Sequence, residues 1–161
     1  MSVPLATLIR RDIVAKVFED EFMDVQSGLI DLCMEVSNGN VDKIYAYCAV
    51  GECSYMFNAF FMVSGQIKDL MELQGMTRDL AFEFLEVGTK DLISLKDLGA
   101  KYNRPIPAEM KLYYDVPTGK FHAEYDYKPS FIKSKRVSPG EAFCAWQDEI
   151  AGIKRPFWKR R

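Results

Sequence analysis

The segment that most limits the fold is residues 106–127, IPAEMKLYYDVPTGKFHAEYDY, which predicts a complete β-hairpin. Successive side chains of a strand point to opposite faces, so the second strand is expected to have a core face and a solvent face. The core face is predicted to hold Phe121, Ala123, Tyr125 and Tyr127. The solvent face is predicted to hold Lys120, His122, Glu124 and Asp126. Between the strands, Pro117 restricts φ and Gly119 supplies a positive φ, so residues 116–119 form the turn.

Two long segments carry the spacing of amphipathic helices. Apolar residues recur at steps of three and four from residue 13 to 36, and a similar stripe runs from about residue 77 to 102. The first stripe is Phe18, Phe22, Val25, Leu29, Leu32 and Val36. The second stripe is Leu80, Phe84, Gly88, Leu92, Leu95, Gly99 and Tyr102. Both segments are therefore predicted to be helices that bury one side, with Thr77 as the N-cap of the second.

A third helix is predicted to begin after Ser138. Serine is a favoured N-cap, Pro139 suits the first turn, and Glu141 has the position of a capping-box glutamate. The buried face of this helix is predicted to consist of Phe143, Trp146, Ile150 and Ile153.

Residues 43–73 predict three antiparallel strands in a meander. The segment is rich in aromatic and β-branched residues, with turns at Gly51-Glu52 and Ser64-Gly65. Its first two strands are apolar at both odd and even positions, so we expect helices on both of their faces. A two-residue turn at Gly51-Glu52 would place Cys48 opposite Tyr55. Cys48 and Cys53 are both predicted to be free thiols.

These elements predict a single-domain α+β fold in the order α-βββ-α-ββ-α. An antiparallel sheet of about five strands, the meander plus the C-terminal hairpin, would pack with three helices over residues 1–153. Residues 154–161, KRPFWKRR, are predicted to form a basic C-terminal tail. At 161 residues and 48% hydrophobic composition, the chain is long and apolar enough to bury a sizeable core, which excludes intrinsic disorder.

The net charge of −2 conceals an uneven distribution. Residues 154–161 hold five of the 21 basic residues, so the rest of the chain carries 16 basic and 23 acidic side chains. An acidic body repels nucleic acid and attracts basic partners, so no direct nucleic-acid binding is expected. The chain has no uninterrupted apolar run long enough for a membrane span, and its N-terminal arginines follow the apolar run instead of preceding it. A soluble, cytoplasmic protein is expected.

Catalytic chemistry is scarce in this sequence. The only histidine, His122, lies in the middle of a predicted strand, whereas acid–base or nucleophilic catalysis needs a base oriented by further groups. An enzyme would require His122 to meet Cys53 or Cys144 in the fold. Glycine-rich phosphate loops are absent from the sequence. We therefore predict no catalytic residues, no cofactor and no enzymatic activity.

Metal binding is also not predicted. The four cysteines, at irregular spacings without a CxxC pair, are typical of reduced core residues, and His122 is far from them in sequence. Asp115, Glu124 and Asp126 would have to converge to bind a divalent cation, and no loop completes such a shell. The tyrosines of the hairpin would suit base stacking only beside a basic groove, and their neighbours are acidic.

The hairpin and the last helix together resemble a known family. The run EMKLYYDVPTGKFHAEYDY, followed by a capped helix with Phe143-x-x-Trp146, is similar to the C-terminal half of the YezG-like immunity protein family. In that family a KL-x-YD-turn-K-F-x-A-acid-Y-x-Y hairpin precedes a helix with an F-x-x-W core. Upstream, residues 42–67, DKIYAYCAVGECSYMFNAFFMVSGQI, resemble the aromatic strand pair that follows the family's N-terminal helix. The resemblance covers roughly residues 10 to 152.

The resemblance implies an antitoxin made beside a secreted polymorphic or contact-dependent bacterial toxin, often a nuclease. Such a protein neutralises the toxin domain by stoichiometric binding, without turnover. The predicted partner-binding residues are His122, Glu124 and Asp126 on the hairpin, and Glu19, Asp20 and Asp24 on the first helix. An alternative is a non-catalytic interaction or regulatory module of the same fold that associates with itself through its apolar strands.

Overall fold

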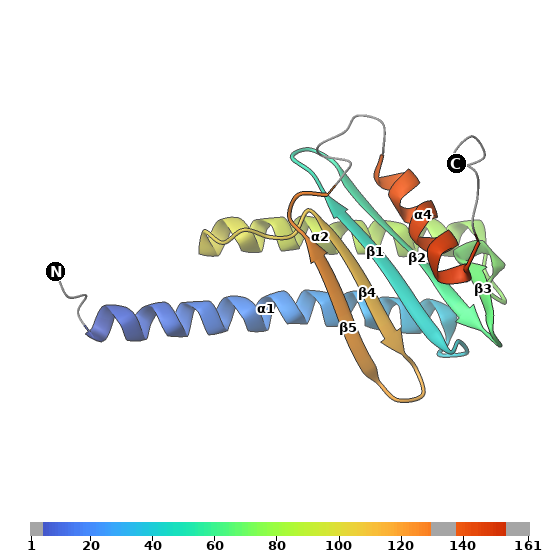
Figure 1. The fold of residues 1–161 in the computed structure, drawn as a ribbon, viewed down its shortest axis with the longest axis horizontal. Helices are drawn as coiled ribbons and strands as arrows, with labels where there is room; N and C mark the ends of the chain where they lie inside the picture. The colour runs from blue at the N-terminus through green and yellow to red at the C-terminus, as the bar shows by residue number, and fades with distance from the viewer. Residues whose placement is uncertain (1–4, 130–137, 154–161) are drawn as a thin grey trace.

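The computed structural model describes residues 5–129 and 138–153, and its elements follow the predicted α-βββ-α-ββ-α order (Figure 1). The three helices are α1 (Leu5–Ser37), α2 (Arg78–Tyr102) and α4 (Pro139–Ala151), and a short 3-10 helix, η1 (Leu70–Glu72), precedes α2. The strands are β1 (Lys43–Val50), β2 (Tyr55–Val63), β3 (Gln66–Asp69), β4 (Glu109–Asp115) and β5 (Lys120–Asp126). The predicted α+β fold is confirmed, and the predicted tail lies outside the described residues.

All five strands form one antiparallel sheet in the order β3-β2-β1-β4-β5. The predicted register of β1 and β2 is wrong, because Cys48 lies opposite Phe57 instead of Tyr55. The connection is a four-residue loop, in which the Gly51 N–H donates to the Ser54 carbonyl at 2.8 Å. A shift of two residues leaves every side chain on the same face of a strand. The apolar pattern therefore cannot distinguish the two registers.

Helices cover both faces of the central strand β1, as predicted. α1 and α2 lie on one face, and α4 lies on the other (Figure 1). Under α1 and α2, the side chains of β1 are aliphatic or small: Ile44, Ala46, Cys48 and Val50. Under α4 they are Tyr45, Tyr47 and Ala49. The side chains of β1 are therefore aliphatic or small under α1 and α2 and mainly aromatic under α4, although Phe57, Phe61 and Phe84 also belong to the core under α1 and α2.

α2 begins and ends where its capping residues predict. The Thr77 side chain accepts a hydrogen bond from the Leu80 N–H, and Asn103 adopts the left-handed conformation after the last turn. Leu80, however, is 47% exposed, so its prediction as a core residue is wrong. Ala81, one position later, faces inward at that end of the helix. Successive residues of a helix point about 100° apart, which leaves Leu80 on the side of α2.

α4 also starts as predicted, with the Ser138 side chain accepting from the Glu141 N–H. Phe143 and Trp146 are buried and Ile150 is partly buried, but Ile153 is 47% exposed, in contrast to the prediction. The helix ends at Ala151, and the chain then turns away through a glycine with positive φ, so Ile153 no longer follows the helical stripe.

The hairpin of β4 and β5 has the predicted turn, with Gly119 at φ 70°. Phe121 and Ala123 pack against the core, but Tyr125 is partly exposed and Tyr127 is 52% exposed, which corrects the prediction. β5 is an edge strand, and Tyr127 follows its last residue. Tyr125 still contacts α1, because its hydroxyl donates to the buried Gln26 Oε1 at 2.6 Å.

No helix among the described residues has the length and apolar composition that crossing a membrane requires.

Candidate functional site

The predicted hairpin residues His122, Glu124 and Asp126 are all exposed on the edge strand β5. The His122 ring lies 5.4 Å from the ring of Tyr113 on β4, and Tyr113 lies 5.4 Å from Trp146 of α4. The three residues therefore belong to the α4 side of the sheet, beyond the part that α4 covers. His122 Nε2 is 3.7 Å from Glu124 Oε1, a contact between two exposed groups that contributes little to stability.

A hollow of about 380 Å³ lies beside His122, next to the end of β4. Tyr45 and Tyr113 form its aromatic wall, and Lys43 and Lys120 line it together with His122. Burial raises the pKa of Tyr113 to about 12, and the Trp146 indole N–H donates to its hydroxyl at 3.2 Å. Tyr113 is therefore a neutral phenol at physiological pH. The hollow offers aromatic surface and charged groups of both signs, since Asp115 also lines it, and its lining residues include no serine or cysteine nucleophile.

The second predicted group, Glu19, Asp20 and Asp24, lies on exposed positions of α1. α1 contacts β5 through Tyr125, whose ring lies 5.5 Å from Phe22. Because neighbouring residues of a strand point to opposite faces, the hairpin group projects away from α1. The fold thus places the two predicted groups on opposite sides of the sheet and does not combine them into one site.

The carboxylates of the hairpin do not converge on a cation. In the register of the two strands, Asp115 lies opposite Lys120 beside the turn. Asp126 lies opposite Glu109 at the other end of the strands. Six residues of a strand separate these ends, which corresponds to about 20 Å. In the described part of the chain, no cluster of three or more histidine, cysteine or acidic side chains is suited to hold a metal ion.

The four cysteines are free thiols, as predicted for Cys48 and Cys53. Cys33 and Cys48 are buried, and desolvation raises the pKa of both, so they are protonated and unreactive. Cys53 is exposed, which corrects its prediction as a core residue, because it lies in the loop between β1 and β2. Cys144 of α4 is partly buried. The described contacts of His122 are with Glu124 and Tyr113, so the histidine–cysteine pair that an enzyme would need is not formed.

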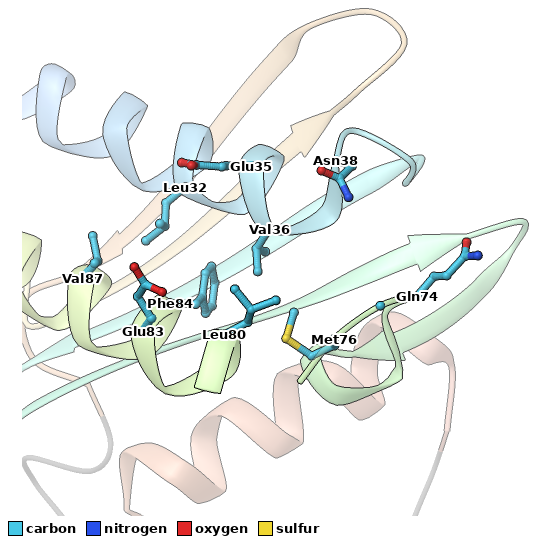
Figure 2. A pocket seen from close by; sticks show the side chains of 11 residues that line it. Leu32, Glu35, Val36, Asn38, Gln74, Met76, Leu80, Glu83, Phe84 and Val87 are labelled. Atoms are coloured by element: carbon cyan, nitrogen blue, oxygen red, sulfur yellow. The ribbon is translucent and has the colours of Figure 1, made fainter. Parts of the chain in front are cut away.

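Sequence reasoning missed a groove between α1 and α2, which Figure 2 shows from close by. The groove has a volume of about 520 Å³, and its lining combines apolar residues, which we call its floor, with the polar residues Glu35, Asn38, Gln74 and Glu83. Its apolar residues are Leu32 and Val36 of α1, Met76 before α2, and Leu80, Phe84 and Val87 of α2. Val87 is 38% exposed and lies outside the predicted core stripe. The sequence did offer one signal of the groove, because Val87 is a large apolar residue that the predicted buried stripe of the helix does not include.

A second apolar hollow, of about 430 Å³, lies on the other side of α2, toward α4. Phe82 and Met71 line it, and Phe82 is 68% exposed. Phe82 also falls outside the predicted core stripe. The N-terminal half of α2 therefore exposes apolar side chains on both of its flanks.

Neither the comparison with protein-family models nor the search of curated proteins returns a match for this chain. The chemistry of the exposed surfaces is therefore the basis for a functional proposal.

Proposed function

We propose that this protein is an immunity protein, a non-catalytic antitoxin that neutralises a bacterial toxin domain by stoichiometric binding. The observation that carries the proposal is the acidic surface of α1 formed by Glu19, Asp20 and Asp24. All three side chains are exposed, and none forms an ion pair with a described residue. Their charge is therefore free to act on a partner.

A basic toxin domain, such as a nuclease, is the partner that this surface suits. Nucleases need positive charge to bind a phosphate backbone, and exposed carboxylates attract such a surface and speed its capture. Val17 and Met23, exposed apolar residues of the same helix, would supply the apolar contact that a stable interface also needs. The proposed setting is the cytoplasm, and no catalytic role is assigned to His122.

A toxicity assay tests this proposal. The toxin-like protein encoded beside this gene is expressed alone and then together with the present protein. We expect cell killing in the first case, protection in the second, and a 1:1 complex that weakens as salt increases. A protein that protects no cell and forms no complex with the neighbouring toxin would contradict the proposal.

A matched pair of charge reversals locates the effect on α1. Asp20→Lys/Asp24→Lys should weaken the complex, whereas Asp97→Lys/Glu149→Lys, with the same change in net charge at exposed positions, should not. Equal weakening by both variants would show that only net charge matters and that α1 is not part of the interface.

A self-associating module is the second candidate. Association through the apolar strands has little surface available, because β1 is covered on both faces. Instead, α1 exposes Ile13 and Val14 in its N-terminal half, and the N-terminal part of this helix extends beyond α2 (Figure 1). If these residues form a dimer contact, light scattering should give a dimer mass that Ile13→Ser/Val14→Ser reduces to a monomer mass.

A further inference from the structure

We propose that the groove between α1 and α2 binds an amphipathic helix of the partner protein, with its apolar side on the groove floor and lysine or arginine residues along its flanks. The inference rests on the proposed function in that it names the part of the protein that holds the toxin domain. It adds a second contact to the acidic surface of α1, in a groove that is separate from the residues that the sequence predicted.

The shape of the groove suits a helix. Its two walls are the C-terminal half of α1 and the N-terminal half of α2, which run side by side (Figure 2). Leu80 and Val87 are two turns apart on α2, so they form a row about 10 Å long. A third helix packs its ridges between two others, and it uses apolar residues at i, i+3, i+4 and i+7 over this length.

The floor of the groove is accessible and not part of the closed core. Leu80 is 47% exposed to solvent and Val87 is 38% exposed, whereas Phe84 between them is buried. In Figure 2 the side chains of Leu32 and Val36 point from α1 toward α2, and Val36 lies next to Leu80. Clustered apolar residues of this kind mark surfaces that a partner covers.

The charge of the groove determines the kind of helix. Glu35 on α1 and Glu83 on α2 are exposed residues of the groove lining, and neither forms an ion pair with a described residue. The lining contains no lysine or arginine. A complementary helix therefore carries basic residues on both sides of its apolar face.

The same charges disfavour a second copy of this chain as the occupant. A two-fold symmetric dimer would place Glu35 and Glu83 against the same two residues of the other copy. The exposed apolar residues at the start of α1 are followed by Asp20 and Asp24, which lie on the same side of the helix as Val17. Docking α1 in the groove would therefore also bring acidic residues together.

A model peptide tests the inference on the full-length protein. The probe is a fluorescein-labelled helix of about 16 residues with leucine at i, i+3, i+4 and i+7 and lysine elsewhere. The first control peptide has the same composition in scrambled order, and the second has glutamate in place of lysine. Fluorescence anisotropy should show that the probe binds at least about tenfold more tightly than either control. Equal binding of the scrambled peptide would overturn the inference, since charge alone would then explain it.

Two matched pairs of protein variants locate the binding site. Glu83→Lys should weaken probe binding about tenfold, and Asp97→Lys, an exposed reversal on the same helix, should change it less than about twofold. Leu80→Ser should weaken it about tenfold, and Ile93→Ser, an exposed apolar change outside the groove, should not. Thermal melts of all four variants check that each is folded. Probe binding that is unchanged in both groove variants would overturn the inference.

The two proposals can fail separately. If the wild-type protein and Leu80→Ser neutralise a toxin equally well, the groove is not its binding site, although the immunity function stands. If probe binding depends on the groove but no toxin is neutralised, the groove inference stands and the immunity function fails. A dimer in solution that Leu80→Ser dissociates would identify a second copy as the occupant and overturn the inference.

Discussion

The two sides of the sheet are covered in opposite ways. On one side the single short helix α4 inserts Trp146, whose ring lies 4.9 Å from Phe60 and 5.9 Å from Tyr45. On the other side, the long helix α2 presents Gly88 to the sheet, and a Cβ at that position would lie 1.9 Å from a ring atom of Phe57. A large side chain fills the space under α4, whereas the absence of a side chain lets α2 approach closely.

This difference explains where the exposed apolar surface lies. α4 is too short to cover the whole sheet, so the hairpin end of its face stays open around His122. α1 and α2 cover the other face along their length, but two neighbouring helices leave a groove on their outer side. The exposed surface is polar and aromatic on the α4 side and apolar with an acidic rim on the α2 side.

The largest expected effect comes from removing the anchor of α4. Trp146→Ala should lower the free energy of unfolding by ~3–5 kcal/mol, because it leaves a cavity among the aromatic side chains of the sheet. Denaturant unfolding measures this change. Ile153→Ala, at an exposed position after the same helix, is the control and should have little effect. A loss below about 1 kcal/mol for Trp146→Ala would show that α4 is not held by a single anchor.

A smaller loss of stability is expected from a substitution in α2 than from Trp146→Ala. Gly88→Ala should destabilise the fold by ~1–3 kcal/mol, since the added methyl group forces Phe57 or the helix to move. Gly28→Ala is the matched control, because a Cβ at this helical glycine meets no atom within 4 Å. It should stabilise α1 by ~0.5–1 kcal/mol. If both changes stabilise the protein, the close approach of α2 is not a constraint.

The core under α4 also predicts that the stability of the protein falls at alkaline pH. Burial, and then the hydrogen bond that the Tyr47 hydroxyl donates to Glu109 Oε2 at 2.5 Å, raise the pKa of Tyr47 above its ordinary value. A raised pKa in the folded state stabilises the protein below the unfolded pKa, about 10, and this contribution is lost as the pH rises further. Tyr47→Phe should cost ~1–2 kcal/mol at neutral pH and flatten the fall in stability above pH ~10. Denaturant unfolding at several pH values measures this fall. If the free energy of unfolding falls equally steeply with pH in the wild type and in Tyr47→Phe, Tyr47 is not the group responsible.

The smallest effect on folding is expected at the hairpin. Glu124→Lys/Asp126→Lys should change the free energy of unfolding by less than about 0.5 kcal/mol, because both side chains are exposed on an edge strand. If the hairpin contacts the toxin, the same variant should weaken toxin binding, as calorimetry would show. Unchanged affinity, together with a loss in Glu83→Lys, would place the interface on the α2 side of the sheet.

The order of the elements could be predicted because the signals that define them are local. Thr77, Ser138 and Gly119 act through their own backbone positions, and each has the predicted role. Predictions failed near the ends and edges of elements. Tyr127 and Ile153 have the spacing of core residues, but each follows the last residue of its element.

The candidate site depended more strongly on the tertiary structure. The predicted residues were all found at exposed positions, since charged side chains rarely enter a core. Their separation onto opposite sides of the sheet was not predictable, because it depends on which face of β5 meets α1. The groove was missed for a related reason. Leu80 has the spacing of a core residue, and only the packing of α1 beside α2 leaves it exposed.

The sequence by itself determined the helices, the strands, the turns and the charge of this protein, because these depend on the spacing of side chains along the chain and on the conformations that glycine, proline and capping residues favour. Only the tertiary structure decided the register of β1 and β2, the separation of the two acidic groups and the presence of the α1/α2 groove. Each of these depends on contacts between residues far apart in sequence, and a periodic apolar pattern is compatible with more than one such contact.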